Sequence, residues 1–219
     1  MINLKAIKIE PKIGVEPFSF EGQKLDFKLT DFWSWSQSDL LNNTVRGILA
    51  EYIVRQDLGI EKSTRTEWDA YDLETKDGIK IEIKSAAYLQ SWKQTNLSKI
   101  SFDIAPTKGW NSETAKYSME AKRQSDYYVF CLLHHKNKKT IDPTQLDQWT
   151  FYVLQTQVLD KQKKNQKRIG LNPLLKLSPT KCRYGKIRRT IKQYINNEKN
   201  TSFYYSNFCV LSKRTKTLN

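Results

Sequence analysis

Residues 71–85 contain two carboxylates and a lysine at a spacing that could serve phosphodiester hydrolysis. Asp72 is followed ten residues later by Glu82, and Lys84 lies two residues further on. Carboxylate oxygens are typical ligands of Mg²⁺, and the backbone carbonyl of Ile83 could add a third oxygen. A lysine beside such an ion can orient the attacking water and offset charge on the phosphate. These residue types predict a magnesium site, which Mn²⁺ can also occupy, that hydrolyses phosphodiesters.

A short hairpin would bring these side chains together. Residues 76–78 read Lys-Asp-Gly, which is turn chemistry, and the isoleucines of 79–83 alternate with charged residues at the period of a half-buried strand. Glu82 and Lys84 therefore share a face of the predicted strand. If the chain folds back at the turn, Asp72 lies opposite Ile81 and Glu82.

An acidic residue on one strand and Glu-x-Lys on the next resembles the motif of the PD-(D/E)xK nuclease superfamily, whose members have the restriction-endonuclease-like fold. The residue before Asp72 is Tyr71, where the motif has proline, and the resemblance covers roughly residues 40–155. It implies a metal-dependent endonuclease that hydrolyses DNA, of the restriction, repair or junction-resolving type. It also implies a homodimer. Asp69 is an alternative first metal ligand, but Asp72 is favoured because it lies closer to the turn.

The resemblance adds two candidate residues outside the hairpin. Many members supply a further glutamate from the preceding helix, and Glu51 occupies that place, where it could reach the metal directly or through water. The apolar residues of 41–53 recur at helical spacing, with Ser38 or Asn42 as the cap. Many members also place a glutamine after the lysine near the cleaved phosphate, and here the candidate is Gln90, with a surface glutamine as the alternative.

The remaining elements predict an α/β fold, a restriction-endonuclease-like mixed β-sheet flanked by helices. Apolar runs predict strands at residues 100–104, 126–133 and 149–156, and residues 111–125 predict a helix. Trp33 and Trp35 are expected to pack in the core or in helix packing, with base-stacking platforms as the alternative. The predicted organisation is a β-rich N-terminal extension (1–38), a nuclease-like core (39–156) and a basic helical C-terminal extension packed on the core (157–219).

Positive charge is concentrated near the C-terminus. Residues 1–100 have a net charge of −1 and residues 101–160 are neutral, whereas residues 161–219 contain 16 lysines and arginines against one acid. Such a segment favours a polyanion, and DNA is the expected partner because binding releases counterions. A basic loop is predicted at 161–168 and an amphipathic helix at 184–196. The predicted DNA-binding residues are Lys93, Lys122, Arg123, Lys163, Lys164, Lys167, Arg168, Lys186, Arg188, Arg189 and Lys192.

Several other classes lack their signatures in this sequence. It has no phosphate-binding loop of the G-x-x-x-x-G-K-[ST] type. No apolar run is long enough to span a membrane and the first residues lack a signal core, which predicts a cytoplasmic protein. The sequence leaves open whether a methyltransferase or a helicase is a partner. The alternative hypothesis is a non-catalytic nucleic-acid-binding protein that uses the basic C-terminal region.

Overall fold

The computed structural model describes residues 7, 9–61, 64–65, 70–111 and 116–197. Its centre is a five-stranded sheet in the order β11-β9-β8-β4-β3. The neighbours β4 and β8 run parallel, while the other pairs are antiparallel. The strands are β3 (Leu73–Glu74), β4 (Lys80–Ala87), β8 (Tyr127–Leu133), β9 (Trp149–Gln155) and β11 (Thr180–Cys182). The predicted α/β fold with a mixed sheet flanked by helices is confirmed.

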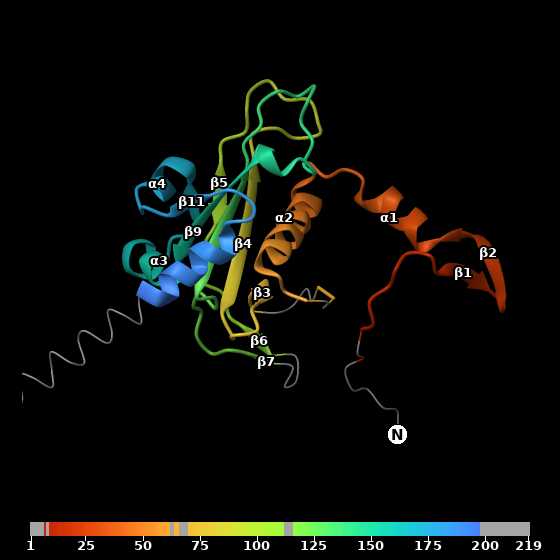
Figure 1. Cartoon of the computed structure of the whole chain (residues 1–219), viewed down its shortest axis with the longest axis horizontal. Helices are drawn as coiled ribbons and strands as arrows, with labels where there is room; N and C mark the ends of the chain where they lie inside the picture. The colour runs from red at the N-terminus through yellow and green to blue at the C-terminus, as the bar shows by residue number, and fades with distance from the viewer. Residues whose placement is uncertain (1–6, 8, 62–63, 66–69, 112–115, 198–219) are drawn as a thin grey trace, which may run out of the picture.

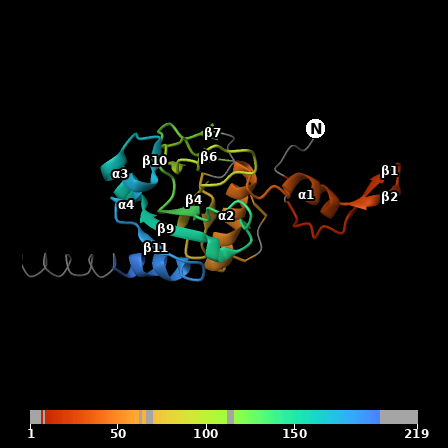
Figure 2. The same ribbon diagram turned by 90° about the horizontal axis from the view of Figure 1, so that it is seen from above.

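The two faces of the sheet are covered by different segments (Figures 1 and 2). One face packs against α2 (Asn43–Leu58) and against a helix over residues 187–197, which we call the C-terminal helix. The other face carries a second apolar cluster. The elements on that side are β5 (Ser101–Asp103), α3 (Thr156–Lys163), β10 (Arg168–Gly170) and α4 (Leu171–Leu175). All seven residues of β8 are buried between the two layers, which explains their continuous apolar run.

The predicted hairpin is present as β3 and β4. Gly78 adopts a φ of 77°, which suits glycine, and its N–H donates to the carbonyl of Thr75 at 2.9 Å. Leu73 pairs with Ile81 in the antiparallel register. Ile81 and Ile83 are buried in the cluster that faces α2. The alternation of apolar and charged residues therefore gives β4 one side in the core and one side that carries Glu82 and Lys84.

Capping contacts at the two ends of α2 position α2 itself and the C-terminal helix. Asn42 caps its start, as one of the two predicted caps, because the Asn42 side chain accepts a hydrogen bond from the Thr44 N–H at 2.9 Å. Near its end, Asp57 accepts hydrogen bonds from the N–H groups of Gly185, Ile187 and Arg188. Asp57 thus caps the C-terminal helix and fixes it beside α2.

The N-terminal segment projects away from the sheet (Figures 1 and 2). It consists of a hairpin of β1 (Pro17–Phe20) and β2 (Gln23–Lys28) followed by α1 (Leu29–Gln37). The strands were predicted, whereas α1 was not. Neither tryptophan lies in the core, since Trp35 is 84% exposed and Trp33 is 37% exposed, but both are on α1, where the ring centroids of Phe32 and Trp35 lie 6.4 Å apart.

Two other predictions are wrong. The described residues of the predicted helix 111–125, which are 111 and 116–125, are not helical, because β6 (Trp110–Asn111) pairs with β7 (Lys116–Tyr117), and the backbones of Thr107 and Lys122 exchange two hydrogen bonds. The Trp110 and Tyr117 rings lie 4.8 Å apart and stabilise this pairing. The basic loop predicted at 161–168 is shorter, because its first residues belong to α3 and its last residue belongs to β10. A 3₁₀ turn, Leu146–Gln148, precedes β9.

Candidate active site

Asp72 is held against β4 at the point where the hairpin pairing ends. Its backbone N–H donates to the carbonyl of Ile81 at 3.1 Å, and its carboxylate Oδ2 accepts the N–H of Ile83 at 2.6 Å. The side chain therefore continues the strand pairing by one step. Because the N–H and C=O of a strand residue face the same neighbour, the Ile83 carbonyl is also directed to this edge. The hairpin thus places Asp72 beside Ile83 and close enough to Glu82 for the two carboxylates to interact.

Lys84 and Glu82 form an ion pair on the outer side of β4. The Lys84 Nζ lies 2.5 Å from the Glu82 Oε1, and their side chains are 26% and 18% exposed. Burial alone would lower the pKa of Lys84, but Glu82, Asp72 and Asp103 raise it above its usual value. Lys84 is therefore an ammonium at neutral pH. It can donate hydrogen bonds and offset negative charge, but it does not remove a proton.

The carboxyl group of Asp72 is strongly perturbed. Burial and the nearby Glu82 raise its pKa to about 7, although the Ile83 N–H and Lys84 act in the opposite direction. Glu51 adds a smaller repulsion. Two carboxylates in a poorly hydrated place repel each other unless a cation lies between them. A buried carboxyl group with a strongly raised pKa beside a second carboxylate makes this place a candidate functional site.

Glu51 lies on α2 and faces a hollow of about 390 Å³ that Asp72 also lines. Arg65 holds Glu51 with two hydrogen bonds, of 2.6 and 3.1 Å. Within the described part of the chain, no three Asp, Glu, His or Cys side chains lie close enough to hold a metal ion. Glu51 is thus near the pair of carboxylates but tied to an arginine, and Asp69 lies outside the described residues.

The oxygen atoms present fit a magnesium ion. Mg²⁺ is typically bound by one or two carboxylates, with water and substrate phosphate completing its shell. Asp72 and Glu82 supply the carboxylates, and the Ile83 carbonyl supplies a neutral oxygen at the same edge. Burial and the nearby Glu82 raise the pKa of Asp72, and a divalent cation beside the two carboxylates would favour their ionised forms, which supports the fit.

Gln90 is buried beyond the end of β4 and does not point to open solvent. Its Oε1 accepts a hydrogen bond from Arg46 Nη1 at 3.3 Å, and its Nε2 lies 3.4 Å from Ser98 Oγ. Arg46 also donates to Ser85 Oγ. Arg46 was not among the predicted site residues, although its spacing of four residues before the buried Ala50 places a charged residue on the inner side of α2.

Tyr128 is a second residue that the sequence did not reveal. It lies beside Glu82 in the parallel register of β4 and β8, and it is buried. Burial and the charge of Glu82 raise the pKa of Tyr128, so its phenol is neutral. In the sequence, Tyr128 is part of an apolar run and carries no signal of proximity to Glu82.

The predicted DNA-binding residues fall into two groups on opposite faces of the sheet. One group lies on the C-terminal helix and the residue before it, and the other lies between α3 and β10. Lys93 and Lys122 are exposed elsewhere. Arg123 is buried instead, with Nη1 2.7 Å from Asp160 Oδ1 and Nε donating to the carbonyl of Ile104. Its side chain is therefore engaged in holding the fold together.

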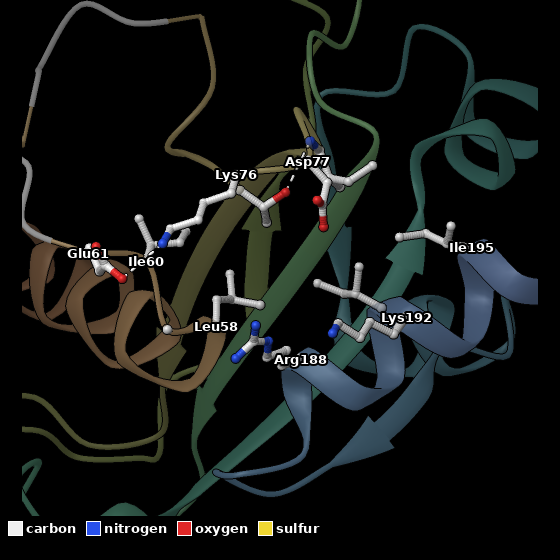
Figure 3. A pocket seen from close by; sticks show the side chains of 12 residues that line it. Leu58, Ile60, Glu61, Lys76, Asp77, Arg188, Lys192 and Ile195 are labelled. Atoms are coloured by element: carbon white, nitrogen blue, oxygen red, sulfur yellow. Dashed lines mark hydrogen bonds and ion pairs between the residues drawn. The ribbon is translucent and has the colours of Figure 1, made fainter.

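A groove joins the C-terminal helix to the turn of the hairpin (Figure 3). Its volume is about 220 Å³, its floor includes Ile191, and Arg188 and Lys192 line it opposite Lys76 and Asp77. Lys76 pairs with Glu61 on the rim, at 2.8 Å. The cations of the C-terminal helix are thus placed at the turn end of the same hairpin that carries the acidic pair.

A mixed sheet with two carboxylates and a lysine at its edge defines an α/β nuclease-like protein. The family model of bacteriophage T4 endonuclease IV matches residues 28–172, about two thirds of the chain, and the chain belongs to this family. The matched region contains every residue of the acidic site. No curated protein matches the chain. Family membership supports a nuclease, while assignment to the PD-(D/E)xK superfamily stays a prediction. No helix in the described part of the chain is long and apolar enough to cross a membrane.

Proposed function

We propose that the protein is a Mg²⁺-dependent endonuclease that hydrolyses phosphodiester bonds in DNA. The observation that carries this proposal is the convergence of Asp72 and Glu82 with Lys84 on one hairpin, where the Ile83 N–H orients Asp72 and Lys84 pairs with Glu82. The endonuclease family of the chain supports the reaction class. Mn²⁺ is expected to replace Mg²⁺, because it accepts the same oxygen ligands.

In this proposal Asp72, Glu82 and the Ile83 carbonyl hold the ion. The bound ion would polarise a phosphate oxygen and lower the pKa of a water molecule. Lys84, as an ammonium, donates hydrogen bonds to the attacking water and to the phosphate and offsets the charge that develops there. The attacking water gives up a proton to solvent as its oxygen forms a bond to phosphorus, the bond to one ester oxygen breaks, and that oxygen takes up a proton from solvent as it leaves. The products are a phosphate monoester and a free hydroxyl.

DNA is the proposed substrate because the surface cations suit a long polyanion. Arg188 and Lys192 lie at the turn end of the hairpin. About three residues of strand separate that turn from Asp72, a length of about 10 Å. A strand of DNA could therefore contact the C-terminal helix while one of its phosphates lies at the acidic pair. Such contacts give affinity that depends on salt and not on base sequence.

The test is cleavage of plasmid, linear and branched DNA in Mg²⁺, Mn²⁺ or EDTA. Wild type is compared with Lys84→Ala and with Lys76→Ala, which removes an exposed lysine from the same hairpin. We expect metal-dependent cutting that falls by at least about 100-fold in Lys84→Ala and stays within about twofold of wild type in Lys76→Ala. The preferred substrate would separate restriction, repair and junction-resolving activities. Tight binding without cutting on every substrate would instead support the non-catalytic alternative.

A further inference from the structure

Arg46 is a buried guanidinium that no carboxylate contacts among the described residues. Only 3% of it is exposed, and it donates to Ser85 Oγ at 3.2 Å, the Leu41 carbonyl at 2.8 Å, Gln90 Oε1 at 3.3 Å and Asn43 Oδ1 at 2.7 Å. All four acceptors are neutral. Burial alone lowers the pKa of Arg46, to about 10. A buried charge without an opposite charge is costly, so an anion at this place would lower the free energy of the protein.

Arg46 lines a hollow of about 430 Å³ that has a positive lining. The other cations around it are Lys99 and Arg168, both exposed, and the single acid is Asp103, which gives a net lining charge of +2. Asp103 lies opposite Arg168 in the register of β5 and β10, and its Oδ1 accepts the Ala105 N–H at 2.9 Å. The positive end of α2 also reaches the hollow, because Asn43 begins that helix.

The hollow adjoins the candidate active site. Ser85 and Ala86 line it and directly follow Lys84 on β4. Ala86 shares a face with Lys84, and two residues of strand span about 6.6 Å. Asp103 contributes to the raised pKa of Lys84, which shows that the two groups are close. A separation of this size is similar to the distance between successive phosphates of a nucleic-acid strand.

We propose that this hollow binds a backbone phosphate of the DNA strand next to the phosphate that is cut, with Arg46 at its base and Lys99 and Arg168 at its rim. The proposal rests on the proposed function and extends it to how the strand is held. Four of the five N–H donors of Arg46 bond neutral acceptors, and the remaining Nη2 N–H can donate a charge-assisted hydrogen bond to a phosphate oxygen. Arg46 binds and positions the strand through the neighbouring phosphate, and it takes no part in breaking the bond.

The first test uses inorganic phosphate as the probe, in EDTA, with the full-length protein. Thermal unfolding is followed against phosphate concentration, and chloride at equal ionic strength is the reference. Wild type is compared with Lys99→Ala/Arg168→Ala and with Lys161→Ala/Lys176→Ala, which removes two exposed lysines outside the hollow. We expect phosphate to raise the melting temperature of wild type and of the control, and to raise it far less in the rim variant. Arg46→Met, where it folds, should abolish the rise.

The second test measures cleavage kinetics on a defined DNA substrate. The rim variant should raise KM about tenfold with kcat within about twofold of wild type, because it loses binding energy and no reacting group. The control variant should change neither value by more than about twofold. Inorganic phosphate should inhibit wild type competitively and the rim variant more weakly, which separates a site for DNA phosphate from one for free phosphate alone.

The outcomes separate this proposal from the proposed function. If phosphate stabilises wild type no more than chloride does, or if the rim and control variants behave alike, the phosphate subsite is wrong even where cleavage is observed. If no metal supports cleavage but DNA binding in EDTA weakens about tenfold in the rim variant and not in the control, the subsite stands and the endonuclease proposal fails.

Discussion

Replacement of Asp72 by asparagine should stabilise the metal-free protein while it removes the metal site. Asparagine has the same shape and its side-chain oxygen can still accept the Ile83 N–H, but it cannot ionise. In wild type, burial and Glu82 raise the pKa of Asp72 from 3.8 to about 7. The folded protein therefore binds this proton more tightly than the unfolded chain does. Stability is lost as pH rises between these two values, and the loss is complete above pH 7.

The size of the effect follows from the two pKa values. A difference of about three pH units corresponds to about 4 kcal/mol, which is the upper limit for the gain in Asp72→Asn at pH 8. Water penetration and relaxation reduce such effects. We therefore expect the stability advantage of Asp72→Asn over wild type to be about 2 kcal/mol larger at pH 8 than at pH 5. For a chain of this length that corresponds to a rise of about 4–8 °C in melting temperature.

The assay is urea unfolding of wild type and Asp72→Asn at pH 5 and pH 8 in EDTA. The matched control is Asp77→Asn, which alters an exposed carboxylate in the turn of the same hairpin. Saturating Mg²⁺ should reverse the order at pH 8, because only wild type gains free energy from binding the ion. The reasoning is refuted if the stability difference is the same at both pH values, or if Asp72→Asn is the less stable protein at pH 8.

Three further predictions follow from the same geometry. Mg²⁺ affinity should rise about fivefold from pH 6 to pH 7, since Asp72 must lose its proton to bind the ion and its pKa is about 7, and titration calorimetry in wild type would show a flat profile if this were wrong. Arg123→Met should lower the free energy of unfolding, measured in urea, by about 2 kcal/mol. The substitution removes the buried Arg123 cation from its ion pair with the half-exposed Asp160. A weaker DNA affinity at unchanged stability would instead support Arg123 as a DNA contact. Arg189→Ala should weaken DNA binding about equally for all sequences and reduce the salt slope by about one, whereas a sequence-dependent loss in fluorescence anisotropy would contradict a phosphate contact.

The parts of the fold that could be predicted are those set by local patterns. The hairpin of β3 and β4 follows from a glycine turn and strict alternation over a few residues, and both features act within one short segment. The strands β8 and β9 follow from apolar runs of strand length. The acidic site could be predicted for the same reason, because its members are ten to twelve residues apart on one hairpin.

Residues 111–125 show where local patterns fail. Glutamate, alanine, lysine and methionine favour a helix there, but the segment has no continuous apolar stripe to bury. Trp110 packs against Tyr117 instead, and Thr107 pairs with Lys122, fifteen positions further along the chain. Tertiary contacts of this kind override helix propensity, which amounts to less than about 1 kcal/mol per residue.

Site residues whose neighbours are far away in the chain could not be predicted from the sequence either. The contacts of Arg46 with Ser85 and Gln90 span 39 and 44 positions of the chain. The position of Tyr128 beside Glu82 requires the parallel register of β4 and β8, which the long connection between them does not specify. A charged residue at a buried helix position is a usable signal that a polar site lies inside, but its partners become known only with the fold.

The unfavourable charges in the core have opposite signs at the two ends of one region. At the hairpin, burial and Glu82 disfavour the ionised form of Asp72 although Lys84 pairs with Glu82, while beyond Lys84 the buried Arg46 bonds only neutral acceptors. Under the two proposals, a metal ion at the hairpin and a DNA phosphate at Arg46 would each bring the opposite charge. The binding of metal and DNA would then recover the stability that the protein loses at each place. The binding energy would therefore favour the strand position at which the bond is cut.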